Sequence, residues 1–147
     1  MKAFKKLMAA ALVCVMALTM LTGCALSEKL DRTALVKALN DVNDVYKYNN
    51  DLNDEAAGAW KQKNNNGIVT EKSGTVTLSG TVYNYAIEEV PSSATSKGNW
   101  KDQAGRINTA LKDSKKTDSK IKVGVEFVTG KKGTNDCDYV VVIAQAK

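Results

Sequence analysis

The sequence contains no histidine among its 147 residues. Histidine is the commonest general base near neutral pH, the usual partner of nucleophilic serine and cysteine, and a frequent metal ligand. Its absence excludes Ser-His and Cys-His catalytic pairs and histidine metal sites. A carboxylate-based activity is the hydrolytic alternative that we consider.

A basic stripe interleaved with aromatic side chains is also missing. The chain has 21 lysines and arginines against 16 aspartates and glutamates, and the lysines are spread among the acids. Proteins that bind nucleic acid usually concentrate their positive charge along one face. We therefore predict no nucleic-acid partner.

The first 24 residues carry the most specific motif. Three lysines and no acid lie before an uncharged apolar run of 14 residues, Leu7 to Met20. This run is shorter than the roughly 20 residues of an ordinary membrane span and is typical of a secretory signal. It leads into Leu21-Thr22-Gly23-Cys24, which resembles the lipobox of bacterial lipoproteins. A secretory signal cut at a small residue and an uncut signal anchor are the alternatives.

The resemblance implies a processing route and a location. Cleavage would fall between Gly23 and Cys24, and Cys24 would carry a diacylglyceryl thioether as the first mature residue. Two acyl chains anchor a protein stably, whereas one binds only marginally. The protein would sit on the extracytoplasmic face of a cell membrane, with residues 1–23 as signal peptide, 24–27 as a short lipid tether and 28–147 as a single domain.

The mature chain implied by this cleavage is short and nearly neutral. Its 124 residues suffice for one hydrophobic core, and its 18 basic and 16 acidic residues give a net charge of +2. Cys14 would leave with the signal and Cys24 would be acylated. Cys137 would then have no partner for an intramolecular disulfide, so we expect packing alone to stabilise the domain.

Apolar residues recur at helical spacing from Leu30 to Trp60. The predicted buried stripe consists of Leu35, Leu39, Val42, Tyr46, Ala56 and Trp60. The predicted solvent face consists of Asp31, Lys37, Asn40, Asp41, Asp44 and Lys47. The Asn/Asp-rich residues 49–54 favour caps and turns, so residues 28–64 are expected to form one bent helix or two. Because Ala56 stands where an EF-hand needs glycine, we predict no metal site there.

Strand-forming residues begin after Gly67. Residues 68–70 and 75–79 are predicted to be strands around a turn at 71–74. A bulge near Gly80 is predicted to turn the following side chains to the other face.

The last third of the sequence predicts a helix and two strands. Asn99 opens an amphipathic helix whose predicted buried stripe is Trp100, Ala104, Ile107 and Leu111. Residues 121–127 alternate as a half-buried strand, and residues 130–133 are predicted to be a turn. Residues 139–146 are apolar on both faces, which is typical of a central strand.

These elements predict an α+β fold. An N-terminal helical region would be followed by a β-hairpin, a helix and a second β-hairpin. We expect the helices to pack on one face of a small antiparallel sheet.

Two tyrosines form the candidate binding face. Tyr83 and Tyr85 share one side of the predicted strand, and paired aromatics suit sugars or peptide partners. The competing interpretation is that they are packed under a helix.

No residues are predicted to be catalytic, and no cofactor is predicted. Glu88 and Glu89 are adjacent, and adjacent strand residues point to opposite faces, so they would not flank one bond. Cys137 lies between two aspartates in a chain without a histidine to activate it, and it is interpreted as the start of a core strand.

The function predicted from these features is a membrane-tethered, non-enzymatic binding or interaction module. Its partners would be the membrane, through Cys24, and an envelope protein or glycan. A carboxylate-based hydrolase of the cell envelope and a small structural or inhibitory lipoprotein are the alternatives.

Overall fold

The computed structural model describes residues 31–91 and 99–147. The predicted signal peptide, lipobox and tether lie outside these residues. The elements are the first helix (residues 31–42), β1 (Tyr46–Tyr48), the 3-10 helix η1 (Asn50–Leu52), α2 (Asn53–Lys63), β2 (Asn64–Asn65), β3 (Ile68–Val69), β4 (Ser73–Leu78), β5 (Thr81–Glu89), α3 (Lys101–Leu111), β6 (Lys116–Thr117), β7 (Lys120–Lys132) and β8 (Asn135–Gln145).

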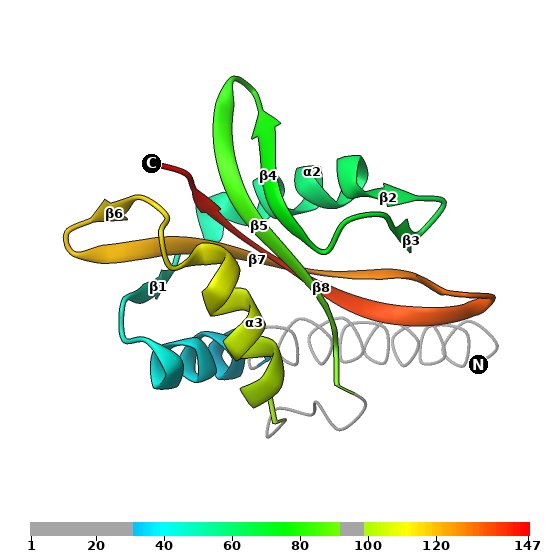
Figure 1. The fold of residues 1–147 in the computed structure, drawn as a ribbon, viewed down its shortest axis with the longest axis horizontal. Helices are drawn as coiled ribbons and strands as arrows, with labels where there is room; N and C mark the ends of the chain where they lie inside the picture. The colour runs from blue at the N-terminus through cyan, green and yellow to red at the C-terminus, as the bar shows by residue number, and fades with distance from the viewer. Residues whose placement is uncertain (1–30, 92–98) are drawn as a thin grey trace, which may run out of the picture.

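Eight strands form one sheet (Figure 1). The order is β2-β3-β7-β8-β5-β4, and both β1 and β6 also pair with β7. The predicted combination of helices with a sheet is confirmed, as is the order hairpin (β4–β5), helix (α3), hairpin (β7–β8). The sheet is mixed rather than antiparallel throughout, because β1 and β3 run parallel to β7.

Strand β8 lies between β5 and β7, which confirms the predicted central strand. Its residues 140–144 are fully buried. Val140, Val142 and Ala144 join one core cluster, whereas Val141 and Ile143 join the other. A strand that is apolar on both faces requires cover on both.

The helices supply this cover on opposite faces, so the prediction of helices on one face is wrong. The first helix and α3 pack on one face through Leu35, Leu39 and the predicted α3 stripe, which is confirmed. Helix α2 packs on the other face through Ala56 and Ala59. In Figure 1 the first helix and α3 lie below the sheet and α2 lies above it.

A strand interrupts the predicted N-terminal helical region. The helix ends at residue 42, and Tyr46 is buried from β1 rather than from a helix. The Asn40 side chain replaces a strand partner for Tyr46: its Oδ1 accepts from the Tyr46 N–H at 2.8 Å, and its Nδ2 donates to the Tyr46 carbonyl at 3.0 Å. Val42, predicted to be buried, is 46% exposed. Sequence periodicity could not detect this amide contact.

The first hairpin turns at Ser79-Gly80, not at residues 71–74. Both turn residues have positive φ, 48° and 83°, and Leu78 pairs with Thr81. This is the two-residue turn that matches strand twist, and glycine adopts positive φ without a steric penalty. Gly80 is therefore a turn residue rather than the predicted bulge, and the side-chain alternation restarts after it.

Gly124 lets η1 approach β7 closely. A Cβ at this position would collide with the backbone carbonyl of Leu52. The neighbouring Asn53 side chain accepts a hydrogen bond from the Val125 N–H at 3.0 Å. The outer edge of β7 is thus covered between its two short parallel neighbours.

Candidate functional site

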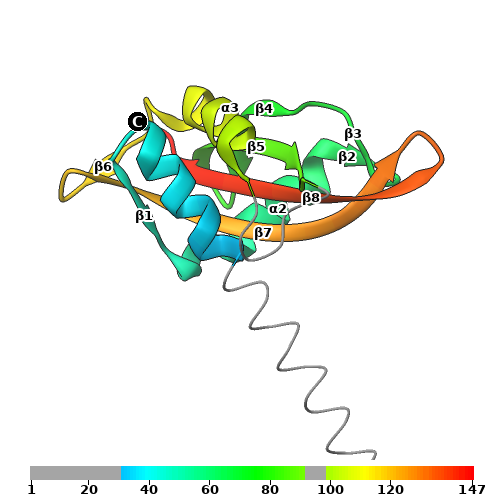
Figure 2. The ribbon, with the colours of Figure 1, turned by 90° about the horizontal axis from the view of Figure 1, so that it is seen from below.

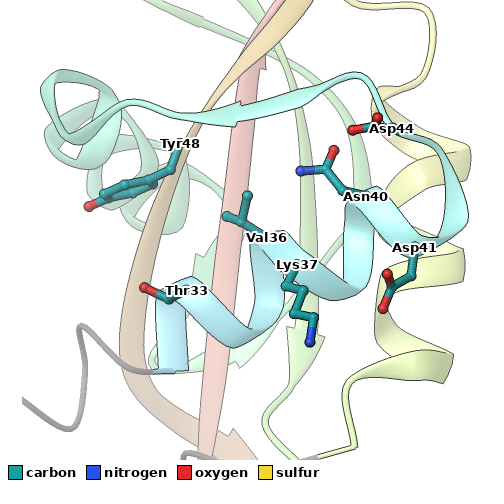
Figure 3. A pocket seen from close by; sticks show the side chains of 7 residues that line it. All are labelled: Thr33, Val36, Lys37, Asn40, Asp41, Asp44 and Tyr48. Atoms are coloured by element: carbon teal, nitrogen blue, oxygen red, sulfur yellow. The ribbon is translucent and has the colours of Figure 1, made fainter.

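An open groove lies between the first helix and β1 (Figure 3). Its volume is about 590 Å³, and its lining residues are Thr33, Val36, Lys37, Asn40, Asp41, Asp44 and Tyr48. The helix supplies one wall with its predicted solvent face. The Tyr48 ring comes from β1, and only the unexpected strand brings it to the groove.

Most polar groups of the groove already have partners within the protein. Asn40 uses both amide atoms on Tyr46. The Tyr48 hydroxyl accepts from Asn53 Nδ2 at 2.6 Å, and Asp44 pairs with Lys120 at 3.2 Å. These groups position the groove walls and are not free for acid-base chemistry.

Lys37 and Asp41 are the exposed charges that remain in the groove. The described residues offer neither of them an ion pair within 4.0 Å. Together with the Tyr48 ring and Val36, they present an apolar floor with one charge of each sign. This arrangement suits reversible recognition of a polar partner.

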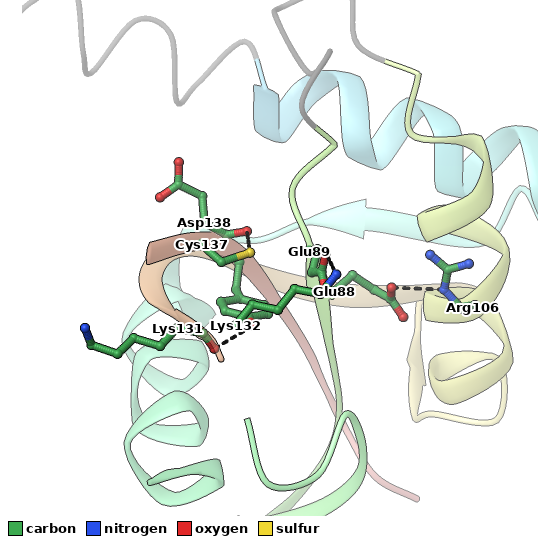
Figure 4. Close-up of polar contacts among 8 residues, drawn as sticks. Glu88, Glu89, Arg106, Lys131, Lys132, Cys137 and Asp138 are labelled. Atoms are coloured by element: carbon green, nitrogen blue, oxygen red, sulfur yellow. Dashed lines mark hydrogen bonds and ion pairs between the residues drawn. The ribbon is translucent and has the colours of Figure 1, made fainter. Parts of the chain in front are cut away.

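A second group of charges lies where β5, α3 and the β7–β8 hairpin meet (Figure 4). We call it the paired-charge region, and its members are Glu88, Glu89, Arg106, Lys131 and Lys132, which Figure 4 labels, together with Asp136. Arg106 Nε lies 2.9 Å from Glu88, Lys132 Nζ lies 3.1 Å from Glu89, and Lys131 Nζ lies 3.5 Å from Asp136. Each cation of this region thus has a carboxylate partner.

The two adjacent glutamates do not converge. Glu88 is directed to α3 through Arg106, whereas Glu89 is directed to the β7–β8 hairpin through Lys132. Because retaining and inverting glycosidases need two carboxyl groups that flank one bond, this geometry does not support glycoside hydrolysis by the pair.

The predicted binding tyrosines are core residues, so the proposed aromatic face is wrong. Tyr85 is 0% exposed and Tyr83 is 8% exposed, and both belong to the cluster under α2. Val76 pairs with Tyr83 and shares that cluster. The two-residue turn keeps all three side chains on one face, whereas the predicted bulge would have separated them.

No family model, curated protein or solved structure matches this chain.

Tyr85 anchors the start of β4 through a small polar cluster. Its hydroxyl donates to the Glu71 carbonyl at 3.3 Å, and Lys63 Nζ lies 2.9 Å from the Glu71 carboxylate. The hydrogen bonds from Lys63 and Tyr85 lower the pKa of Glu71. Burial, and then Glu71, raise the pKa of Tyr85. Both shifts favour the protonation states that these groups hold at neutral pH, which indicates a structural cluster.

Cys137 is half-buried on β8, and its thiol lies 3.7 Å from the Asp138 carbonyl. It borders the cluster under α2, as the interpretation of a core-strand residue requires. Leu21, Thr22, Gly23 and Cys24 lie outside the described residues. Among the residues described, no group of three His, Cys, Asp or Glu side chains is placed to hold a metal ion.

Proposed function

We propose that this chain is a lipoprotein of the bacterial cell envelope, anchored through Cys24, that acts as a non-enzymatic binding module. The observation that carries the proposal is the sequence Leu21-Thr22-Gly23-Cys24 after an apolar run that is too short for a span. A diacylglyceryl group on Cys24 would supply the two chains that stable anchoring needs. The domain would then lie on the extracytoplasmic face.

The distance along the chain from Cys24 to the described helix supports a close tether. Residue 31, seven residues after Cys24, is already helical. At about 3.3 to 3.6 Å per extended residue, the link spans at most about 25 Å. Within the described ranges, no helix has the length and apolar character needed to cross a membrane.

The binding interpretation is favoured over a hydrolase by the state of the carboxylates. Glu88 and Glu89 are held in separate ion pairs, and Asp44 is paired with Lys120. A general acid or base has to reach the same substrate atom as its partner. A carboxylate-based hydrolase is the weaker alternative for this reason.

The groove of the first helix is the proposed recognition surface for an envelope protein or glycan. This groove takes the place of Tyr83 and Tyr85 as the proposed binding surface. It presents Lys37 and Asp41 beside the ring of Tyr48. A structural or inhibitory lipoprotein would use the same kind of surface against a neighbouring enzyme. Identification of the captured protein would separate these two roles.

The anchor is tested by metabolic labelling with a palmitate analogue. Cys24→Ser should lose the label and accumulate as unprocessed precursor, while Cys137→Ser should label normally. Undiminished label on the Cys24 variant would refute the anchor.

The groove is tested by capture of partners from detergent-solubilised membranes. Lys37→Glu and Asp41→Lys should each reduce a stoichiometric partner, because each reverses one groove charge. Lys61→Glu, an exposed change on α2, is the matched control. Capture that is equal for all variants would reject the groove as the recognition surface.

A further inference from the structure

Tertiary structure gathers six exposed lysines at the end of the molecule opposite the β7–β8 hairpin tip. We call this set the lysine region: Lys47, Lys112, Lys115, Lys116, Lys122 and Lys147. They come from β1, β6, β7, the residues that follow α3 and the segment after β8. They surround this end rather than share one sheet face, because Lys116 is the register partner of the core residue Ile121, whereas Lys47 and Lys122 point away from that core. Lys115 donates its backbone N–H to Gln145 at 2.8 Å, and its side chain borders the same surface hollow as Lys147.

None of these six lysines has an ion-pair partner among the described residues. The acids at this end are Asp41, Asp44, Asp113 and Asp118. Asp44 pairs with Lys120 at 3.2 Å. Six lysines against the three other aspartates leave a net side-chain charge of +3.

Lys47 and Lys122 are a like-charged pair in adjacent strands. They are register partners in the parallel β1–β7 ladder, so their side chains leave the same face of the sheet. Like charges placed directly across a ladder are destabilising. An unfavourable pairing of like charges that no contact within the protein offsets is typical of a functional surface.

Lys122 of this pair lies on β7, the strand that the start of the first helix contacts, and both side chains of the pair leave the sheet face opposite to that helix. Arg32 Nε, at the start of the first helix, donates to the Val125 carbonyl at 3.2 Å. Val125 is three residues from Lys122 along β7, which is about 10 Å at roughly 3.3 Å per residue. Figure 2 shows β1 running beside the first helix toward its start.

We propose that the lysine region docks on the acidic phospholipid headgroups of the membrane that holds the lipid anchor. The inference rests on the proposed anchoring through Cys24. A link that spans at most about 25 Å keeps the domain, and with it the exposed lysines at this end, close to the bilayer. Phosphodiester headgroups would supply the negative charge that these lysines lack among the described residues of the protein. Docking leaves the groove of the first helix on a different side of β1 from Lys47 and Lys122.

The test measures lysine acetylation in the mature lipidated protein by mass spectrometry. The protein is reconstituted in vesicles of phosphatidylcholine alone or with phosphatidylglycerol at about one third of the lipid. Each lysine near an anionic surface gains about fivefold in association, so Lys47 and Lys122 should react at least about fivefold more slowly with phosphatidylglycerol. Lys61 and Lys72, exposed elsewhere, should react equally in both. High salt should remove the protection, because screening shortens the range of surface electrostatics.

A Lys47→Gln, Lys122→Gln double variant tests whether the region acts as a unit. Protection of Lys115 and Lys116 should fall in this variant, whereas a Lys61→Gln, Lys72→Gln variant should keep it. Equal acetylation of wild-type protein in both vesicle types would overturn the docking proposal. Protection by soluble polyphosphate in phosphatidylcholine vesicles, without protection by phosphatidylglycerol, would also overturn it and assign the lysines to a soluble polyanion.

Flotation of the vesicles separates failure of the docking from failure of the anchor. Protein that floats with phosphatidylcholine vesicles but shows no selective protection is anchored and not docked. Protein that fails to float with either vesicle type refutes the anchor and the docking proposal that depends on it.

Discussion

The paired-charge region has three cations and the lysine region has six, and the two regions differ in whether these cations have carboxylate partners. In the first, Arg106, Lys131 and Lys132 each lie within 3.5 Å of a carboxylate oxygen. In the second, six lysines have no such partner among the described residues, and two of them stand side by side. The contrast shows that this fold can pair its charges where they serve stability. Exposed lysines elsewhere, such as Lys61 and Lys72, also lack an ion pair among the described residues, so the feature that distinguishes the lysine region is the like-charged pair of Lys47 and Lys122.

The strongest way to break the comparison is to push η1 away from β7, beside the β1–β7 ladder, without changing any charge. Gly124→Ala places a Cβ against the Leu52 carbonyl of η1, so the backbone of η1 or β7 has to move next to the Lys47–Lys122 register pair. Overpacking of this kind costs about 1–3 kcal/mol, and we expect the upper end, about 3 kcal/mol, in urea unfolding.

Gly105→Ala is the matched control for this change. No atom lies within 4 Å of the added Cβ, and alanine in a helix interior is favoured over glycine by about 0.5–1 kcal/mol. Similar losses for the two variants would show that the approach of η1 to β7 is not tight.

Removal of a cation from the paired-charge region should destabilise the protein. Arg106→Gln leaves the Glu88 side chain, only 11% exposed, without its partner at 2.9 Å. Hydrogen bonds to charged groups contribute about 1.5–3 kcal/mol, and we expect a loss of about 2 kcal/mol at pH 7. A Glu88→Gln change added to this variant should recover part of the loss, and no recovery would argue against direct coupling.

Alkaline pH should weaken the attachment of β1 to the helices. Burial, followed by the charge of Asp113, raises the pKa of Tyr46 from 10.0 to about 12, and its hydroxyl donates to Asn108 Oδ1 at 2.7 Å. Because the folded state favours the neutral phenol, its contribution is complete below pH 10 and falls as the pH rises to 12. Tyr46→Phe should flatten this part of the stability profile, and an unchanged slope would contradict the assignment.

Removal of a cation from the lysine region should have the smallest effect, with the opposite sign. Lys122→Gln relieves repulsion from Lys47, and cross-strand pairs are worth about 0.2–1 kcal/mol, so we expect a gain of about 0.5 kcal/mol at low salt. Lys131→Gln, which removes an exposed pair, should cost between about 0 and 0.5 kcal/mol. A loss at Lys122 would show that this lysine has a stabilising partner.

Local pattern was sufficient for several parts of the fold. The apolar alternation of residues 139–146 on both faces identified the central strand, and the stripe from Trp100 to Leu111 identified α3. Both predictions are correct because burial of a helix or strand face produces a periodic pattern of apolar residues, which is visible in the sequence. The hairpin turn was misplaced, since Ser79-Gly80 resembles a bulge signal until its strand partners are known.

The candidate site was less predictable than the fold. The sequence correctly placed Lys37 and Asp41 on the exposed face of a helix. Asn40, predicted for the same face, is half-buried against Tyr46, and Asp44 lies in the turn after the helix. The sequence did not predict that Tyr48 lines the groove. Tyr48 lies on β1, and β1 depends on the hydrogen bonds between Asn40 and Tyr46 and on pairing with β7. The sequence also assigned a binding role to Tyr83 and Tyr85, which the restarted alternation places in the core.

The sequence by itself determined which chemistry is missing, which strand is central and which helix face is buried, because these depend on composition and period. The lipobox is also read from the sequence, and it stays a prediction. Tertiary structure alone decided that helices cover both faces and that β1 divides the helical region. It also decided that Lys47 and Lys122, 75 positions apart in the sequence, become neighbours. These features depend on contacts between segments distant in the chain, and such contacts leave no local period to read.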